Sequence, residues 1–303
     1  MKVGFVSAIL GEWSFEEMID TAADMGFQCG RACWPQGKAE RRYAGVSHID
    51  VDGLTEEKAE YILDYCRKRK VEISAMAFYP NVMDGDEKRR EANISHLIKV
   101  IDASARLGVN LVTTFIGRDQ TKTVEENLEL VKVIWPSILA HAEEKQVRIA
   151  IENCPMLFGW EQWPGGQNLM TTPAIWEKIF ESLKSENLGL NYDPSHFVWQ
   201  MMDYIQPLYQ FKDKIFHVHY KDIKLYEDKL KKVGTMAYPL EYMSPKLPGL
   251  GDVDWGKYVS ALTDIGYDGY TCIEVEDKAF EGTRERVLDS LRLSKKYMDQ
   301  FII

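Results

Sequence analysis

The feature that most constrains the fold is a repeated alternation of short apolar runs with longer segments of helical periodicity. Runs rich in β-branched and aromatic residues recur along the chain, at 3–8, 27–34, 72–79, 110–117, 148–154, 188–193, 215–222 and 270–277. Between them, apolar residues recur at the three-to-four-residue spacing of amphipathic helices. Strands that alternate with helices in this way indicate a parallel sheet covered by helices.

Local signals at the ends of the predicted helices agree with this alternation. Ser14 followed by Glu17 matches a capping box, and the segment 55–70 carries acids in its first turn and bases in its last. The segment 203–213 is the weakest helix prediction because it contains Pro207.

Strand–helix units fill all 303 residues without a Ser/Pro-rich linker, so we predict a single (β/α)8 TIM barrel over residues 1–303. An open doubly wound sheet is the alternative, but the segment 7–15 after the first strand lacks the glycine-rich phosphate turn typical of that fold. Two excursions without regular periodicity, 35–54 and 223–253, follow strands and are expected to overhang the C-terminal face of the barrel.

Composition excludes several classes of partner. The formal net charge of −10 argues against nucleic acid and against an anionic membrane surface, and no apolar run is long enough to predict a transmembrane helix. The first residues are interpreted as a strand rather than a signal peptide, so a cytoplasmic location is expected. The five cysteines are an odd number without a CxxC pair, and we interpret them as reduced, mostly buried thiols outside the site.

Potential metal ligands collect where four successive strands end, the informative position in such a barrel. They are Glu152, Asp193, His217 or His219, and Glu274 or Glu276. Carboxylates that converge after buried strands repel one another unless a cation lies among them. His219 is preferred because it is nearer the strand end, and Glu276 is expected closer to solvent than Glu274. Three carboxylates and one imidazole suit Mn²⁺, Mg²⁺ or Co²⁺ better than a thiolate-type zinc site.

Each of these residues also has a plain structural alternative. Asp193 followed by Pro194 could cap a helix. A buried histidine is more often a core residue than a ligand, and Lys221-Asp222 could be a surface pair. The acidic strand ends could be ion-paired with Lys221 or with arginines. The coincidence of four such strand ends favours the metal site over these separate explanations.

Residues near the predicted strand ends also suit a sugar pocket. Arg118 and Asn153 are candidate hydroxyl donors, and His196 lies one turn beyond Asp193, where it could reach a substrate. Aromatic side chains that could stack on sugar faces occur at the same level, although packing is the alternative for most of them: Trp13, Trp34, Phe78, Tyr79, Phe115, Trp160, Trp163 and Trp199.

With these motifs in view, the sequence resembles the xylose isomerase-like TIM-barrel superfamily and its sugar phosphate isomerase/epimerase branch, which includes ketose 3-epimerases and inosose isomerases and dehydratases. The resemblance covers essentially the whole chain and depends on "AIENCP", "GLNYDPSHFVW", "FHVHYKD", "LPGLGDVDW" and "GYDGYTCIEVED". It implies one divalent ion on Glu152, Asp193, His219 and Glu274, and a substrate contact from His196. Mn²⁺ is the expected ion, with Mg²⁺, Co²⁺ or Zn²⁺ as alternatives.

The segments "ACWPQGKAERRYAGVSHIDV", "TTFIGRD" and "WPGGQNL" resemble a subgroup associated with 3-oxo-glycosides. Some of its members are α subunits of C-glycoside deglycosidases, which pair with a small β subunit. This second resemblance implies Trp163 near the substrate. It leaves two forms of assembly open, a homo-oligomer or a complex with a small partner subunit.

The expected activity is metal-dependent isomerisation or epimerisation of a ketose or keto-sugar, including a 3-oxo-glycoside, through an enediolate. Glu152 and Glu274 would exchange the proton on opposite faces of one carbon, and His217 or Lys221 could tune the substrate contact of His196. The alternative is elimination by a lyase, dehydratase or deglycosidase at the same site. A non-catalytic sugar-binding protein and an endonuclease-IV-like nuclease are further readings, but few histidines and the acidic charge argue against the nuclease.

Overall fold

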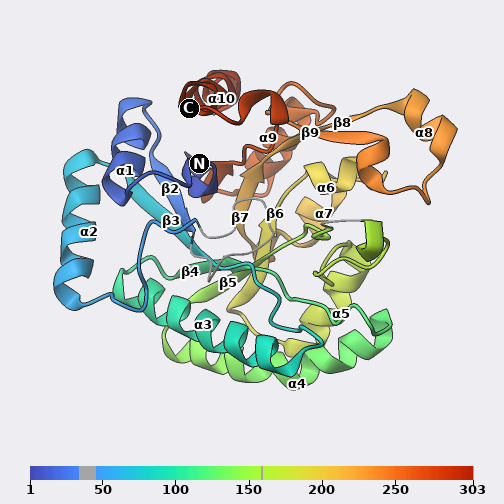
Figure 1. The fold of residues 1–303 in the computed structure, drawn as a ribbon, viewed down its shortest axis with the longest axis horizontal. Coiled ribbons are helices and arrows are strands. Elements are labelled where there is room, and N and C mark those ends of the chain that lie inside the picture. The colour runs from blue at the N-terminus through green and yellow to red at the C-terminus, as the bar shows by residue number, and fades with distance from the viewer. Residues whose placement is uncertain (34–45, 158–159, 303) are drawn as a thin grey trace.

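The barrel forms as predicted. The computed structural model describes residues 1–33, 46–157 and 160–302, and its parallel strands close into a barrel in the order β1-β10-β7-β6-β5-β4-β3-β2 (Figure 1). The barrel strands are β1 (Lys2–Val6), β2 (Cys29–Cys33), β3 (Glu72–Ala77), β4 (Leu111–Thr114), β5 (Arg148–Glu152), β6 (Leu188–Tyr192), β7 (Ile215–Tyr220) and β10 (Tyr270–Ile273).

Helices surround this sheet (Figure 1), and their starts follow the capping signals of the sequence. Ser14 and Glu17 form the predicted capping box, and Thr123 with Glu126 forms another. Pro207 lies in the first turn of α7, where its missing N–H costs nothing, so a short helix does form there. The helices are α1 (Phe15–Asp24), α2 (Glu56–Arg69), α3 (Glu87–Arg106), α4 (Val124–Glu144), α5 (Pro173–Leu183), α6 (Ser195–Val198), α7 (Gln206–Gln210), α8 (Glu227–Val233), α9 (Trp255–Asp264) and α10 (Arg284–Met298).

Alternation along each strand separates the helix-facing side from the barrel interior. Tyr192 on β6 is fully buried on the helix-facing side, where it stacks on Phe197 and meets the edge of Trp176. Its neighbours in sequence, Asn191 and Asp193, therefore point the other way, into the barrel. Within the described residues, no helix is both long and apolar enough to cross a bilayer.

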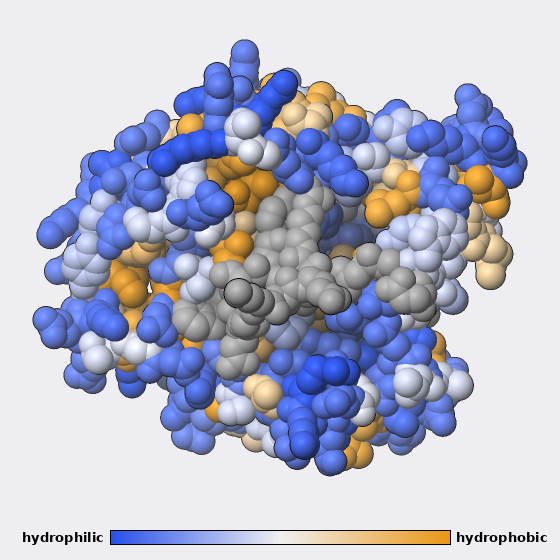
Figure 2. All heavy atoms as spheres, viewed as in Figure 1, coloured by the Kyte–Doolittle hydropathy of each residue, from blue (hydrophilic) through white to orange (hydrophobic). Residues whose placement is uncertain are grey.

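The excursion at 223–253 is more regular than we predicted from its lack of periodicity. It contains α8 and an antiparallel pair of strands, β8 (Asp222–Leu225) and β9 (Met243–Lys246). Figure 2 shows apolar atoms over the part of this excursion around α8. Pairing between the two strands stabilises regular structure that the hydrophobic periodicity of such short segments does not reveal. Of the other predicted excursion, 35–54, residues 35–45 lie outside the described chain, as does Trp34.

Asp222 fixes the return of this excursion to the barrel. Its buried carboxylate accepts hydrogen bonds from the backbone N–H groups of Gly249 and Val253 and from the indole of Trp255. A Cβ on Gly251 would come within 2.2 Å of the same carboxylate, so the close approach requires glycine there. The sequence "LPGLGDVDW" therefore closes the loop over Asp222, which is a buried anchor rather than a member of a surface pair.

Candidate metal centre and active site

Four potential metal ligands from consecutive strands meet at the C-terminal end of the barrel. Glu152 ends β5, Asp193 follows β6, His219 lies on β7 and Glu274 follows β10. One donor atom from each residue lies within 4.8 Å of the donor atoms of the other three. Glu152, Asp193 and His219 are buried, whereas the Glu274 side chain keeps 14% of its exposure. The structure thus brings together the four residues that we expected to form a cation site.

Strand register shows which inward-facing residues lie side by side. The ladder pairs Glu152 with Asn191, Asn191 with His217, and His219 with Cys272. Side chains that face the barrel interior come at every second residue of a strand, and we group them here by the contacts they make. We call the ligand-bearing group at the mouth of the barrel the upper layer (Glu152, Asp193, His219, Lys221 and Glu274). The hydrogen-bonded group beside and below it is the lower layer (Ser74, Asn191, His217 and Cys272).

Lys221 places a buried cation inside the upper layer. Its Nζ lies 2.9 Å from Oε2 of Glu274 and 3.1 Å from Oδ2 of Asp193, and 3.4 Å from Oε2 of the more exposed Glu276. Burial alone would lower the pKa of this ammonium, but the neighbouring carboxylates outweigh burial and raise the pKa well above its usual value. Lys221 is therefore a permanent positive charge among the candidate ligands.

Asp193 is held by both the backbone and this charge. Its Oδ1 accepts a hydrogen bond from the N–H of Ser195 at 2.8 Å, as a turn-forming aspartate does, while Oδ2 faces Lys221 and His196. Burial alone would raise the pKa of the Asp193 carboxyl, but the charges of Lys221 and His196 hold it below its usual value. Oδ1 therefore takes the capping role that we considered for this residue, and Oδ2 belongs to the site.

His196, at the start of α6, lies with its ring against the upper layer. Nε2 is 3.3 Å from Oδ2 of Asp193 and 3.0 Å from Nζ of Lys221, and Nδ1 accepts a long hydrogen bond of 3.4 Å from the indole of Trp199. Burial lowers the pKa of the imidazole, but the negative charges of Cys154 and Asp193 outweigh burial and the Lys221 cation, and raise it to about 10. His196 therefore brings a polar ring nitrogen beside the four ligands.

His217 lies below the candidate ligands, and its influence on substrate binding stays a prediction. It is fully buried in the lower layer, where Nδ1 is 2.9 Å from Oδ1 of Asn191 and Nε2 is 3.2 Å from Oγ of Ser74 and 3.6 Å from Sγ of Cys272. The two-residue spacing that places His217 on the same side as His219 also places it one layer deeper. It supports the site from below.

Asn191 joins the two layers, and sequence reasoning missed it. Its Nδ2 is 2.9 Å from Nε2 of His219 and 3.3 Å from Oε2 of Glu152, while Oδ1 faces His217. This leaves Nδ1 of His219 as the ring nitrogen that faces Glu152 and Glu274, at 3.6 and 3.2 Å. The available signal was its position two residues before Asp193, on the inward face of the same strand.

Asn153 is hydrogen-bonded to the backbone of Asp193, and its contact with a sugar hydroxyl stays a prediction. Its Nδ2 donates to the carbonyl of Asp193 at 2.9 Å, and its Oδ1 accepts from the N–H of Asp193 at 2.8 Å. Asn168 similarly donates to the carbonyls of Glu152 and Cys154, at 2.8 and 2.7 Å. Both amides fix the backbone that carries the ligands.

Aromatic side chains connect the neighbouring loops. The indole of Trp163 donates to the carbonyl of Met236 at 2.9 Å and lies 6.4 Å from the ring of Trp199, which itself touches His196. The guanidinium of Arg118 lies under Gly165, where a Cβ would approach it to 3.4 Å. Trp163 and Arg118 thus belong to the loops around the site, and substrate contact by either of them stays a prediction.

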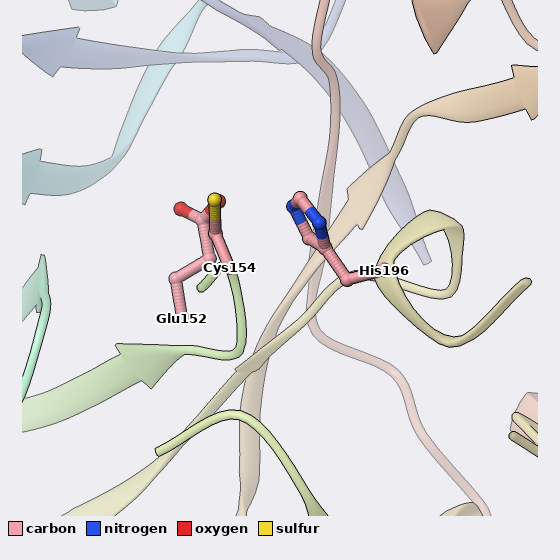
Figure 3. Close-up of side chains that lie close together, drawn as sticks. All are labelled: Glu152, Cys154 and His196. Atoms are coloured by element: carbon pink, nitrogen blue, oxygen red, sulfur yellow. The ribbon is translucent and has the colours of Figure 1, made fainter. Parts of the chain in front are cut away.

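Cys154, which we interpreted as lying outside the site, is close to two of its residues. Figure 3 shows Cys154 together with Glu152 and His196, and donor atoms of the three residues lie within 4.8 Å of one another. Cys154 is partly exposed, whereas the other described free cysteines, Cys29, Cys66 and Cys272, are buried. It stands two residues after Glu152, a spacing that could have indicated the same face.

The donor set of the upper layer fits a hard or borderline divalent cation. Three carboxylates and one imidazole are the ligand types that Mn²⁺, Mg²⁺ and Co²⁺ accept, and buried carboxylates in such numbers need more positive charge than one lysine provides. Glu276 stays outside the four-residue group, and its side chain is 29% exposed. Glu274 was therefore the better choice of the two glutamates for this position.

Comparison with known proteins agrees with the barrel fold. The profile of the xylose isomerase-like TIM barrel family matches residues 19–297. The uncharacterized protein YfiH of Bacillus subtilis is 25% identical to the chain, over 91% of this chain and 93% of that protein. Inosose dehydratase of Lactiplantibacillus plantarum is 22% identical over 86% of each chain.

Solved structures with the same fold include enzymes of several activities. The probable 3-DHS dehydratase AsbF of Bacillus anthracis superposes with a TM-score of 0.73 at 15% identity, over 99% of both chains. D-psicose 3-epimerase of Clostridium cellulolyticum H10 gives 0.70 at 14% identity, over 100% of this chain and 99% of that one. The IOLI protein with a bound zinc atom gives 0.72 at 18% identity, over 100% and 98%. At these identities the likeness shows the fold alone.

Proposed function

Because the chain belongs to the xylose isomerase-like TIM barrel family, whose members are sugar-modifying enzymes, we propose that it is a Mn²⁺-dependent isomerase or epimerase of a ketose or keto-sugar. The observation that carries the proposal is the convergence of Glu152, Asp193, His219 and Glu274 within 4.8 Å. Mg²⁺, Co²⁺ and Zn²⁺ are the alternative ions.

The bound cation would polarise a substrate carbonyl and so acidify the neighbouring C–H. Glu152 and Glu274 are the proposed pair of proton-transfer groups, one on each face of that carbon. Their surroundings differ: Glu274 is paired with Lys221 at 2.9 Å, whereas Glu152 lies against the amide of Asn191 at 3.3 Å. Two carboxylates in unequal surroundings can carry the proton in turn.

His196 and Lys221 are the proposed substrate-orienting groups. Both carry polar nitrogens at the edge of the upper layer, and the positive charge of Lys221 suits an oxygen that becomes negative in the enediolate. Three further residues would act indirectly, by holding the site residues in position: Asn153, Asn191 and His217.

The test is solvent exchange at the carbon next to the carbonyl. Wild-type protein with Mn²⁺ and a keto-sugar panel in D₂O should incorporate deuterium at that carbon, as read by proton NMR. Glu152→Gln should abolish incorporation, whereas Glu144→Gln, an exposed change at the end of α4, should retain it. Exchange at the wild-type rate in Glu152→Gln would refute the proposed role.

A second candidate is elimination at the same site, and the named inosose dehydratases among the relatives favour it. With a leaving group β to the carbonyl, loss of the same proton would expel that group instead of returning the proton. Offering a keto-cyclitol and a 3-oxo-glycoside, and following loss of water or release of the aglycone, separates the two activities. Release without net epimerisation would make the protein a lyase or a deglycosidase.

Assembly and location are proposed on the same basis. We expect either a homo-oligomer or a complex with a small partner subunit, which light scattering of the purified chain, alone and with a candidate subunit, can separate. We expect a cytoplasmic location because the described cysteines are free thiols, and fractionation of the source cell tests it.

A further inference from the structure

The loop that follows β4 carries a positive charge without a counter-ion. Within the described residues, the guanidinium of the partly buried Arg118 forms no ion pair, and its Nε is a buried atom without a hydrogen-bond partner. Burial lowers the pKa of this group, and no neighbouring carboxylate in the described part of the chain opposes that effect. A buried charge is costly without a partner, so this arginine indicates a ligand that is an anion.

The carboxylate next to Arg118 in the sequence is bound by other groups. Asp119 is buried, and its Oδ1 accepts hydrogen bonds from the N–H and the hydroxyl of Thr121 at 3.0 and 2.7 Å. Its Oδ2 lies 3.6 Å from Nζ of Lys122. Asp119 and Lys122 therefore compensate each other, and neither of them is the partner of Arg118.

The backbone at Arg118 is held in place from two sides. The amide of Asn81 donates to the carbonyl of Arg118 at 2.7 Å, and its oxygen accepts from the N–H of Arg118 at 3.0 Å. Gly117 has a φ of +87°, and a Cβ there would come within 2.6 Å of the same amide oxygen, so this contact requires glycine. On the other side, Gly165 packs on the guanidinium, and Gln120 donates to the carbonyl of Gly165 at 2.9 Å. The guanidinium is thus positioned by the fold.

This loop is connected to the candidate cation site through two aromatic rings. Phe115 lies three residues before Arg118, and its ring centroid is 4.5 Å from that of Tyr79. The hydroxyl of Tyr79 lies 3.3 Å from Nδ2 of Asn191, which in turn contacts Glu152. Arg118 therefore belongs to the same end of the barrel as the candidate ligands, in the neighbouring part of its wall.

The single positive charge favours a carboxylate over a phosphate. A carboxylate carries one negative charge and accepts two parallel hydrogen bonds from one planar guanidinium. A phosphate ester carries about two negative charges at neutral pH, so one arginine would leave negative charge unbalanced beside the adjacent, buried Asp119. Lys122, the next cation along this loop, already pairs with Asp119.

We propose that Arg118 binds a carboxylate of the substrate. The substrate of the proposed function, on which this inference rests, is then a keto-sugar acid. Its carbonyl faces the cation among the four candidate ligands, and its carboxylate pairs with Arg118 at the wall formed by the loops after β4 and β5.

Thermal melting of the metal-free protein tests the anion site without any turnover. Replacing chloride with acetate at constant ionic strength should raise the melting temperature of the wild type by about 2 to 4 °C more than that of Arg118→Met. In chloride, Arg118→Met should melt no lower than the wild type, because it removes an uncompensated charge. Arg89→Met, which removes an exposed arginine, should respond to acetate as the wild type does.

Three melting results overturn the proposal. The first is an equal effect of acetate on the wild type and on Arg118→Met. The second is an Arg118-dependent shift that is larger with inorganic phosphate than with acetate. The third is a lower melting temperature of Arg118→Met in chloride, which would make the arginine a structural residue.

A matched set of keto-sugars tests the substrate class. D-Fructose, D-fructuronate and the 6-phosphate of D-fructose differ only at the terminal carbon, which carries a hydroxyl, a carboxylate or a phosphate. With Mn²⁺ in D₂O, the KM for deuterium incorporation should be about tenfold lower for D-fructuronate than for D-fructose, and Arg118→Met should remove that difference. A lower KM for the phosphate than for D-fructuronate contradicts the inference. Absence of exchange with all three compounds, together with the acetate shift, would count against the proposed function and support the anion site.

Discussion

The upper and lower layers of the barrel interior lie on the same strands and face the same way, but their chemistry is different. In the lower layer, polar groups contact one another: Ser74, Asn191, His217 and Cys272 lie within hydrogen-bonding distance along a chain of contacts of 2.9 to 3.6 Å. In the upper layer, Lys221 contacts the carboxylates of Asp193 and Glu274, and a third carboxylate, that of Glu152, lies beside His219. Two residues further along β7 or β10, the hydrogen-bonded lower layer gives way to the charged upper layer.

This difference shows which layer needs a partner from outside. Buried polar groups are stable once they are hydrogen-bonded, so the lower layer is compatible with an ordinary closed barrel core. Buried carboxylates are stable only when positive charge compensates them. The barrel supplies Lys221 for this purpose, and a divalent cation would supply the rest.

The largest expected effect comes from removing a charge from the upper layer without changing its shape. Asp193→Asn keeps an oxygen that can accept from the Ser195 N–H but loses the charge that faces Lys221. Loss of a direct ligand should exceed the cost of losing an outer-shell partner, so we expect Mn²⁺ affinity to fall by about 100-fold or more. Isothermal titration with Mn²⁺ measures this.

Asp203→Asn is the matched control, because Asp203 also follows β6 and accepts a 2.8 Å hydrogen bond from the N–H two residues later, but it is exposed. It should bind Mn²⁺ as the wild type does. Equal affinity in Asp193→Asn and Asp203→Asn would mean that the upper layer does not hold the cation.

A smaller loss of Mn²⁺ affinity is expected when Asn191, which links the two layers, is replaced. Asn191→Ala removes the amide that contacts His219 and Glu152, and loss of such an outer-shell partner lowers metal affinity by about 10- to 100-fold. Asn187→Ala, at the opposite end of β6, removes a hydrogen bond to the carbonyl of Val147 and should leave Mn²⁺ affinity unchanged. If both variants bind alike, the lower layer does not orient the upper one.

The sequence was sufficient to predict that the four candidate ligands converge, because ionisable side chains stand at the ends of four apolar runs. Glu152, Asp193 and Glu274 follow such runs directly, and His219 was preferred to His217 because it is nearer the strand end. The repeated strand–helix pattern predicts that these ends meet. The barrel itself follows from the same pattern.

The lower layer and the supporting amides were harder to predict, because asparagine and serine inside a strand look like ordinary polar residues. The partner of Asn191 is 26 residues away and that of Ser74 is 143 residues away, so only register and barrel closure reveal them. The greater depth of His217 was predictable from its position two residues before His219, but its partners Ser74 and Asn191 were not. We did not consider Cys154 because a count of cysteines bears only on disulfides. The count does not show that the loop after β5 brings this thiol close to His196.

Substitution of Lys221 should change Mn²⁺ affinity in the opposite direction. Lys221→Met removes a positive charge about 3 Å from two ligand oxygens, so Mn²⁺ should meet less repulsion and bind about tenfold more tightly. The metal-free variant should also be less stable, because its carboxylates lose their compensating charge. Titration and thermal melting with and without Mn²⁺ measure both effects.

Lys224→Met is the control, because Lys224 pairs with Asp252 at the surface of β8. It should change neither Mn²⁺ affinity nor the stabilisation by Mn²⁺. Weaker Mn²⁺ binding in Lys221→Met than in the wild type would show that Lys221 orients the ligands more than it competes with the cation.

The smallest expected effect is confined to the lower layer. Ser74→Ala removes the hydroxyl that lies 3.2 Å from Nε2 of His217, while Cys272 still contacts that nitrogen. The free energy of unfolding should fall by about 1 kcal/mol, the typical net value of one buried hydrogen bond. Because no charge changes, Mn²⁺ affinity should stay within about twofold of the wild type, and Ser137→Ala, on the exposed face of α4, should change neither quantity. Urea unfolding and Mn²⁺ titration of the same preparations measure both, and a large loss of affinity in Ser74→Ala would mean that the layers cannot be separated into floor and site.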